Sequence, residues 1–318
     1  MSTQALVHAE HLTRYYSQTC AVDDVSFDLA RGEVLGFLGP NGAGKSSTMQ
    51  MITGNLAPGT GQLSIAGTDL LEHPRQAKRE IGYLPEQPPV YRELTVDEYL
   101  RYCARLNRIP RRHINSAIST AKDRTGLGDV GRRLIGNLSK GYQQRVGIAQ
   151  AIIHNPAVVI LDEPTVGLDP LQIREIRALI CELGKEHGII LSTHILPEVQ
   201  ATCTRVQIIN RGRLVFSDTT AGLESRMNAT SLIAGFHDTP ELAALQQLAG
   251  VTRAEPLADN RVRIHYRDNN PAEALVAASV AQHWRLQELT PESRSLEQIF
   301  IDLTCSEEQH AQAGEDTP

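Results

Sequence analysis

The chain has 318 residues, 41% of them hydrophobic, which is enough for one large domain and a small second one. Its formal net charge of −6 argues against a surface built to bind nucleic acid. The five cysteines are scattered without metal-site spacing and fit the reduced thiols of a cytosolic protein. The sequence has no run of about 18 apolar residues and no signal-peptide core near its start, so we expect no membrane-spanning segment.

The first elements are expected to be strands, over residues 5–7, 21–22 and 25–29. Between the first two lies a pair of tyrosines. The ring of Tyr16 could stack on a nucleobase, although ordinary packing explains a tyrosine pair equally well.

An apolar strand over residues 34–38 leads into the pattern GxxxxGK[ST] at the start of a helix. Backbone amides of such a glycine-rich loop converge on an anion at the helix N-terminus. Lys45 would reach the β- and γ-phosphates of a nucleoside triphosphate, and the Ser46 hydroxyl would ligate Mg²⁺. A glycine-rich turn that matches by chance is the alternative. The loop and its flank are Gly39, Pro40, Asn41, Gly42, Ala43, Gly44, Lys45, Ser46 and Ser47.

The next segment supplies a second, smaller sheet and a helical region. Alternation over residues 62–66 predicts a small antiparallel sheet. A strand over residues 81–84 ends at Glu86 and Gln87, in a proline-rich loop at the sheet edge where ligands bind in open α/β folds. Residues 95–138 read as mostly helical.

Ser139 is placed to cap the following helix, and with the Gly141 backbone it makes a second element suited to binding an anion. A simple capped helix start explains the same residues. After that helix, an apolar strand over residues 157–161 ends in Asp162 and Glu163, and paired carboxylates at a buried strand end are costly unless they bind something.

These two carboxylates point in opposite directions because side chains alternate along a strand. Asp162 is therefore predicted to hold Mg²⁺ through water, and Glu163 to take the proton of an attacking water. Asp169 starts the next helix, and the strand over residues 189–192 ends near His194, at the predicted edge of the same sheet. A lone histidine at such a position is most often a packing or capping residue.

In order and spacing, these elements resemble the ATP-binding subunit of an ABC transporter over about residues 5–223. The loop from Gly39 to Ser47 resembles the Walker A motif, and residues 138–144 (Leu-Ser-Lys-Gly-Tyr-Gln-Gln) resemble the ABC signature. Residues 158–163 resemble Walker B, Asp169 the D-loop, and His194 the switch histidine. The signature distinguishes this family from P-loop kinases, GTPases and helicases.

The resemblance implies an α/β P-loop NTPase with a RecA-like core, an antiparallel β subdomain and a helical subdomain at about residues 90–155. It implies ATP and Mg²⁺ as ligands, with Tyr16 stacking on adenine. Glu163 would be the general base, while Lys45 and His194 would hold the γ-phosphate.

The signature residues Ser139, Gly141 and Gln143 would contact the ATP of the opposite subunit. That arrangement implies a head-to-tail dimer, most simply a homodimer, because the chain carries one set of motifs.

Three residues depart from the family pattern. Ser47 stands where threonine is commoner after Walker A, a change that the hydroxyl chemistry tolerates. Lys140 stands where the signature commonly has glycine, and Glu86 aligns with the Q-loop glutamine, with Gln87 one residue further on. Glu86 could meet Mg²⁺ through a water, and the Q-loop is the segment that signals to the membrane partner. The motifs are most similar to the ABC-2 exporter branch, which includes gliding-motility and copper-maturation systems.

The pattern changes after the ATPase region, which we assign to residues 1–224. Residues 225–304 predict an accessory α+β domain with the order β-α-β-β-α-β, typical of a ferredoxin-like fold, followed by a short helix over residues 295–301. This domain could contribute to dimer contact or to regulation, and a passive role is the alternative. Residues 305–318 predict a disordered tail.

We therefore expect an ATPase that energises a separate membrane permease at the cytoplasmic face of the cell membrane. The family resemblance implies that this permease is an exporter. A soluble ABC-type regulatory or mechanochemical ATPase without a permease is the alternative. Proteins of that kind typically carry two nucleotide domains, a long coiled coil or a basic surface, and none of these is visible in the sequence.

Overall fold

The computed structural model describes residues 5–227, 231–267 and 269–292, and it divides into two compact units, Met1–Thr220 and Ala221–Pro318. The division falls close to the predicted boundary after residue 224. The predicted helix over residues 295–301 and the predicted tail lie outside the described residues. No helix in the described ranges is long and apolar enough to cross a membrane.

The first unit is built on a six-stranded sheet with the order β10-β9-β3-β8-β7-β6. The strands from β9 to β6 are parallel, and β10 joins the edge as the antiparallel partner of β9. Because β3, β7 and β8 are neighbours and run in one direction, their carboxyl ends meet at one edge, as predicted. The bounds are β3 Val34–Leu38, β6 Ile81–Leu84, β7 Val158–Asp162, β8 Gly188–Thr193, β9 Arg205–Asn210 and β10 Arg213–Thr219.

A second, antiparallel sheet has the order β2-β1-β4-β5, from β1 Val7–Tyr16, β2 Thr19–Leu29, β4 Thr60–Ile65 and β5 Thr68–Asp69. The β1–β2 pair is longer than predicted, because register shifts let the pairing continue to Tyr16 and Thr19. The tyrosine pair is thus part of a strand rather than of a connection. Phe27 and Phe37 pack edge to face, 5.3 Å apart, in the core that the two sheets share.

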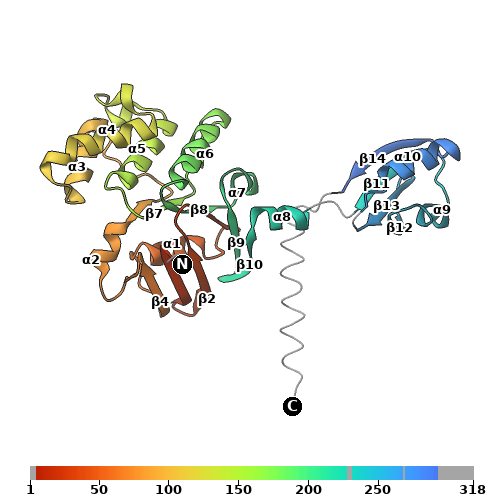
Figure 1. Ribbon diagram of the computed structural model, residues 1–318, viewed down its shortest axis with the longest axis horizontal. Coiled ribbons are helices and arrows are strands. Elements are labelled where there is room, and N and C mark those ends of the chain that lie inside the picture. The colour runs from red at the N-terminus through yellow and green to blue at the C-terminus, as the bar shows by residue number, and fades with distance from the viewer. Residues whose placement is uncertain (1–4, 228–230, 268, 293–318) are drawn as a thin grey trace, which may run out of the picture. The chain divides into compact units, whose positions relative to one another are not determined.

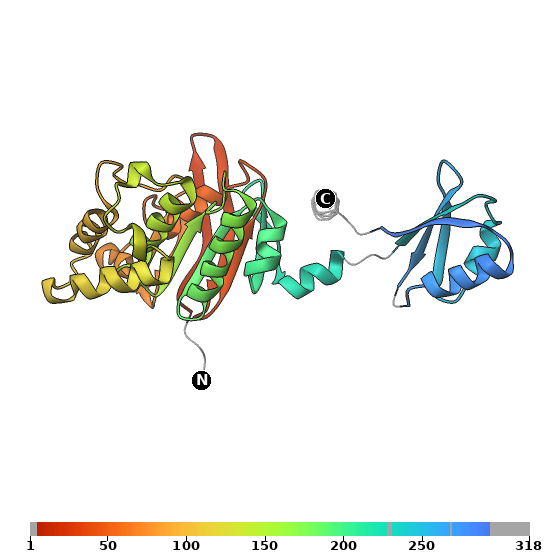
Figure 2. The same ribbon diagram turned by 90° about the horizontal axis from the view of Figure 1, so that it is seen from above.

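The helical subdomain predicted at about residues 90–155 contains α3 Val96–Leu106, α4 Ile114–Thr125 and α5 Lys140–Ile152. In both ribbon views these helices, yellow to yellow-green, lie together on one side of the first unit (Figure 1, Figure 2). Thr95 and Glu98 form a capping box at the start of α3, and Gly126, with a φ of 68°, ends α4. The other helices are α1 Lys45–Ile52, α2 Pro74–Ala77, α6 Pro170–Gly184, α7 Leu196–Thr202 and α8 Thr220–Met227, with 3₁₀ turns η1 Lys78–Glu80, η2 Arg111–His113, η3 Gly128–Val130 and η4 Ile135–Asn137.

The second unit contains an antiparallel sheet of order β12-β13-β11-β14. Its elements follow one another as β-α-β-β-α-β, the order on which the ferredoxin-like prediction depends. Phe236 and Trp284 meet edge to face in its own hydrophobic core, 6.2 Å apart. The bounds are β11 Ser231–Phe236, α9 Leu242–Gln246, β12 Val251–Pro256, β13 Arg261–Tyr266, α10 Ala272–Ala281 and β14 Leu286–Pro291.

Candidate functional site

The loop between β3 and α1 needs glycine at two positions where the backbone is crowded. A Cβ atom on Gly39 would lie 2.4 Å from the carbonyl oxygen of Ile209, and one on Gly44 would lie 2.5 Å from that of Ala21. Gly44 also has a φ of 109°, which side-chain-bearing residues rarely adopt. The loop therefore turns tightly into α1 and leaves the amides of the first helical turn without side-chain cover, as an anion site requires.

Lys45 is the first residue of α1 and is almost fully buried, with 6% of its surface exposed. Its ammonium donates hydrogen bonds to the carbonyl oxygens of Gly39, at 2.7 Å, and Pro40, at 3.2 Å. The same nitrogen lies 3.7 Å from Oε1 of Glu163. Burial lowers the pKa of Lys45, and the carboxylates of Glu163 and Asp162 oppose that effect.

Glu163 follows β7 directly and has a φ of 48°, a left-handed conformation that is uncommon outside glycine. Its amide donates to the carbonyl oxygen of Ser192, at 2.9 Å, at the end of the neighbouring strand β8. Nδ1 of His194 lies 2.9 and 3.0 Å from the two carboxylate oxygens of Glu163. The predicted meeting of Glu163 and His194 at one sheet edge is thus observed, and strained backbone of this kind is typical of functional sites.

Asp162 is the last residue of β7 and is 6% exposed. Burial raises the pKa of its carboxyl group, and the nearby carboxylates of Glu163 and Glu86 raise it further. Its Oδ1 is fully buried and has no hydrogen-bond partner in the described part of the chain. The Lys45 ammonium favours the charged form of this carboxyl group. The unpartnered Oδ1 leaves a buried acceptor that is suited to a further cation.

Lys45, Glu163 and His194 line one pocket of 480 Å³. Five parts of the sequence contribute to it: β2, the phosphate loop, the Glu86 segment, the loop after β7 and the turn after β8. The lining residues are Ala21, Asn41, Gly42, Gly44, Lys45, Ser46, Ser47, Glu86, Glu163, Val166 and His194.

Tyr16 is not among the lining residues. It lies at the end of β1, 44% exposed, with the Arg14 guanidinium 5.5 Å from its ring centre. Ala21, on the following strand β2, does line the pocket. The stacking of Tyr16 on adenine stays a prediction.

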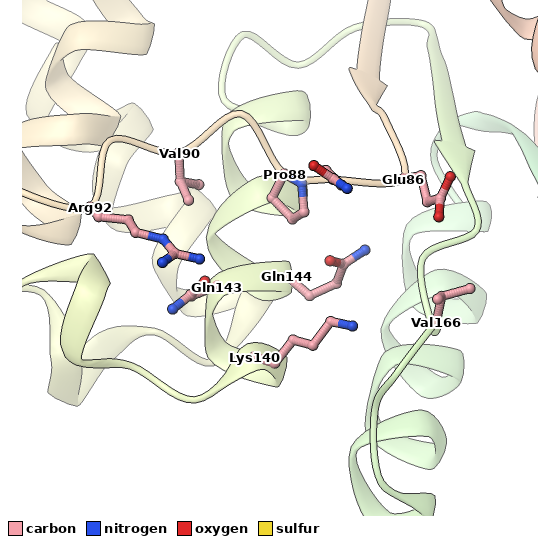
Figure 3. A pocket seen from close by; sticks show the side chains of 9 residues that line it. Glu86, Pro88, Val90, Arg92, Lys140, Gln143, Gln144 and Val166 are labelled. Atoms are coloured by element: carbon pink, nitrogen blue, oxygen red, sulfur yellow. The ribbon is translucent and has the colours of Figure 1, made fainter.

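A second cavity of 550 Å³ lies beside the first and shares Glu86 and Val166 with it. Figure 3 shows Glu86 near Val166, with the side chains of Lys140, Gln143 and Gln144 on α5. Gln87, Pro88, Val90 and Arg92 complete its lining. Glu86 thus stands at the junction between the phosphate pocket and a groove against the helical subdomain.

The signature residues are ordered locally but do not line the phosphate pocket of their own chain. Ser139 caps α5 by accepting a hydrogen bond from the Tyr142 amide, at 3.4 Å, as predicted. Gly141 is buried, and a Cβ atom there would lie 2.7 Å from the Gln172 side chain. Gln143 donates to the carbonyl oxygens of Ile135 and Leu138.

Asp169 caps α6 by accepting hydrogen bonds from the amides of Leu171 and Gln172.

One residue of this region was not anticipated from the sequence. Glu198 on α7 is 1% exposed and accepts hydrogen bonds from Thr165, in the loop after β7, and from Thr193, at the end of β8. A single glutamate inside a helix carries no motif, so only the structure could identify it.

Because the strand order brings the phosphate loop, Glu163 and His194 into a single pocket, the first unit is a P-loop nucleoside triphosphatase. A family model described as "ABC transporter" matches residues 22–166. Comparisons with curated proteins indicate the same family. The chain belongs to the ATP-binding proteins of ABC transporters and is an ATPase subunit of that family.

Two curated relatives illustrate the similarity. The bacitracin transport ATP-binding protein BcrA of Bacillus licheniformis is 39% identical over 217 residues, which are 68% of this chain and 69% of the relative. An uncharacterized ABC transporter ATP-binding protein of Bacillus subtilis, YhcH, is 30% identical over 97% of this chain and 99% of its own length.

Solved structures give the same fold for the first unit. The cbiO1 protein from Clostridium perfringens, described as part of the ABC transporter complex cbiONQ, matches with a TM-score of 0.65 and 30% identity. The match covers 70% of this chain and 91% of that one. A structure described as the ATP-binding subunit of an ABC transporter matches with a TM-score of 0.63 and 33% identity, over 69% of this chain and 92% of that one. The α/β P-loop prediction is confirmed by these likenesses.

Proposed function

We propose that two copies of this chain bind ATP and Mg²⁺ at composite sites, hydrolyse ATP with Glu163 as general base, and drive a separate membrane permease of the exporter type. The observation that carries the proposal is the pocket around Lys45, Glu163 and His194. In the described residues of one chain, Ser139 and Gly141 are not part of that pocket's lining. A second copy placed head to tail would supply them, with their helix N-terminus directed at the γ-phosphate.

In the proposed reaction, a water molecule attacks the γ-phosphorus of ATP while Glu163 takes its proton. The bond between the γ-phosphorus and the bridging oxygen breaks, which yields ADP and phosphate. Lys45 binds the phosphates in place of its present carbonyl partners, and His194 orients the carboxylate through the hydrogen bonds at 2.9 and 3.0 Å. Such catalysis depends chiefly on positioning and on charge stabilisation.

The residues present fit Mg²⁺ when ATP is bound. No cluster of three or more His, Cys, Asp or Glu side chains able to hold a metal occurs in the ranges that the structure describes. Mg²⁺ typically takes one or two protein oxygens together with substrate phosphates and waters, so an all-protein cage is not required. Ser46 lines the pocket, and the unpartnered Oδ1 of Asp162 offers a buried acceptor. These two residues would hold the ion, which would neutralise phosphate charge during hydrolysis.

Glu86 is proposed to act near the metal, through water. Its carboxylate lines the phosphate pocket and is close enough to Asp162 to raise the pKa of that residue. The Glu86→Gln variant restores the family's usual residue but removes one negative charge. The Mg²⁺ concentration for half-maximal ATP hydrolysis is expected to rise by roughly threefold to tenfold, the scale of one charge near a solvated cation.

A titration of ATPase activity with Mg²⁺ measures this shift. The matched control is Glu72→Gln, which removes the same charge from an exposed residue away from the pocket. An unchanged Mg²⁺ dependence in Glu86→Gln would contradict a role near the metal. The remaining role of Glu86 would then be in the groove of Figure 3, which it also lines.

The permease is proposed because the family consists of transporter subunits, and because no helix in the described residues could itself cross a membrane. Such a chain would be held at the membrane by its partner. We expect the tagged chain, extracted from its native membranes in mild detergent, to purify with a multi-span protein in fixed ratio. After reconstitution of that complex in vesicles, its ATPase rate should differ from that of the chain alone. A chain that hydrolyses ATP at full rate with no membrane protein attached would favour the regulatory alternative.

A further inference from the structure

Glu198 on α7 places a carboxylate in the protein interior, beside the loops that carry Glu163 and His194. It is 1% exposed. Its Oε1 accepts a hydrogen bond from the hydroxyl of Thr165, and its Oε2 accepts one from the hydroxyl of Thr193, at 2.7 Å. Both threonines are buried. The two oxygens of one side chain therefore bind two separate segments.

Each threonine belongs to a loop of the pocket. Thr165 lies two residues after Glu163, and Thr193 ends β8 immediately before His194. The Thr193 hydroxyl also accepts a hydrogen bond from the Ile195 amide, at 3.1 Å, and this bond closes a turn around His194. Glu198 thereby connects the loop after β7 to the turn after β8.

An ionised carboxylate in such a position is not a favourable way to fill space. Removing a charge from water costs several kcal/mol, and well-packed apolar residues often replace buried ion pairs without loss of stability. The compensating groups here are the two hydroxyls and the Arg177 guanidinium of α6, whose Nη2 lies 3.9 Å from Oε1. A charged group with these partners fixes geometry, which an apolar side chain cannot do.

We propose that Glu198 is a positioning residue for ATP hydrolysis. It keeps the two loops in fixed positions relative to each other, so that the Glu163 carboxylate stays within 2.9 to 3.0 Å of His194 Nδ1. Glu198 does not line the phosphate pocket and acts through the two threonines. The inference rests on the proposed roles of Glu163 and His194 in the reaction.

The test is a double-mutant cycle between Glu198→Ala and Glu163→Gln. In the wild-type background, Glu198→Ala should lower kcat by roughly 10–100-fold, the scale of a small misplacement of catalytic groups. ATP affinity should change by less than about twofold, because the phosphate loop is not touched. In the Glu163→Gln background, the same substitution should have little further effect, because the group that it positions is already inactive.

The Glu198→Gln variant keeps the shape and one carbonyl acceptor, so it should retain more activity than Glu198→Ala. Thr202→Val is the matched control: it removes another buried hydroxyl of α7, one that bonds to the Glu198 backbone carbonyl rather than to a catalytic loop. This control should lower the melting temperature without changing kcat at a temperature where it is folded.

Three results would overturn the proposal: an equal fall in kcat in both backgrounds, a fall in ATP affinity that matches the fall in kcat, or a folded variant with wild-type kcat. If Glu198→Ala does not fold, Thr193→Val and Thr165→Val each remove one of the two bonds and replace the hydroxyl by a methyl group. Wild-type kcat in both folded threonine variants would overturn it as well. The Glu163→Gln variant alone reports on the proposed function, so the two ideas fail separately.

Discussion

Glu163→Gln is expected to lower the rate of ATP hydrolysis by about 10²–10⁴, the usual contribution of a general base. The amide cannot accept the proton of the attacking water. It keeps the size of the side chain and an oxygen for the His194 ring, so the pocket should retain its shape. ATP binding should persist or strengthen, because the carboxylate that lies 3.7 Å from the Lys45 ammonium is gone.

Single-turnover hydrolysis and equilibrium binding of ATP measure the two effects separately. Glu182→Gln, on the exposed face of α6, makes the same chemical change away from the pocket and should leave both quantities unchanged. Turnover near the wild-type rate in Glu163→Gln would remove Glu163 from its proposed role and would direct attention to Asp162 or Glu86 as the proton acceptor.

The arrangement of the core could be predicted from the sequence because it depends on local patterns. Apolar runs gave the buried strands β3, β7 and β8, and motif spacing placed their polar ends on one edge. The length of the β1–β2 pair was not predictable, because it depends on register shifts that no residue type in the sequence indicates. The sequence pattern therefore places the tyrosines in a connection, although they belong to β1.

The functional site also combines features that the local sequence indicates with features that depend on tertiary packing. Residue identity and spacing identified Lys45, Glu163 and His194. The left-handed backbone of Glu163 and the carbonyl partners of Lys45 depend on tertiary packing, so they could not be derived. Glu198 was missed for the same reason: its partners lie 33 and 5 residues away in sequence and share no motif.

The composite dimer makes a prediction that no single-chain site makes. Lys45→Ala should abolish phosphate binding in its own pocket, and Gly141→Asp should place a negative charge against the γ-phosphate of the other chain's ATP. An aspartate in the first turn of α5 is compatible with the helix, because acidic residues are favourable there. Its Cβ would lie 2.7 Å from the end of the Gln172 side chain, so that side chain must move, and a melting curve of the variant checks that it is folded. Each variant alone forms dimers with two defective sites, so both should be nearly inactive in ATP hydrolysis.

Mixing the two variants should restore activity. In a mixed dimer, the intact phosphate loop of the Gly141→Asp chain faces the intact signature of the Lys45→Ala chain, while the other site carries both defects. With random exchange and independent sites, the equimolar mixture should reach roughly a quarter of the wild-type rate, since half of the dimers have one working site of two. Lys45→Ala mixed with wild type contains the same one-site dimers and calibrates how fast they turn over. If that control is active while the mixture of variants is not, or if Gly141→Asp alone hydrolyses ATP at the wild-type rate, the signature does not complete the site of a second chain.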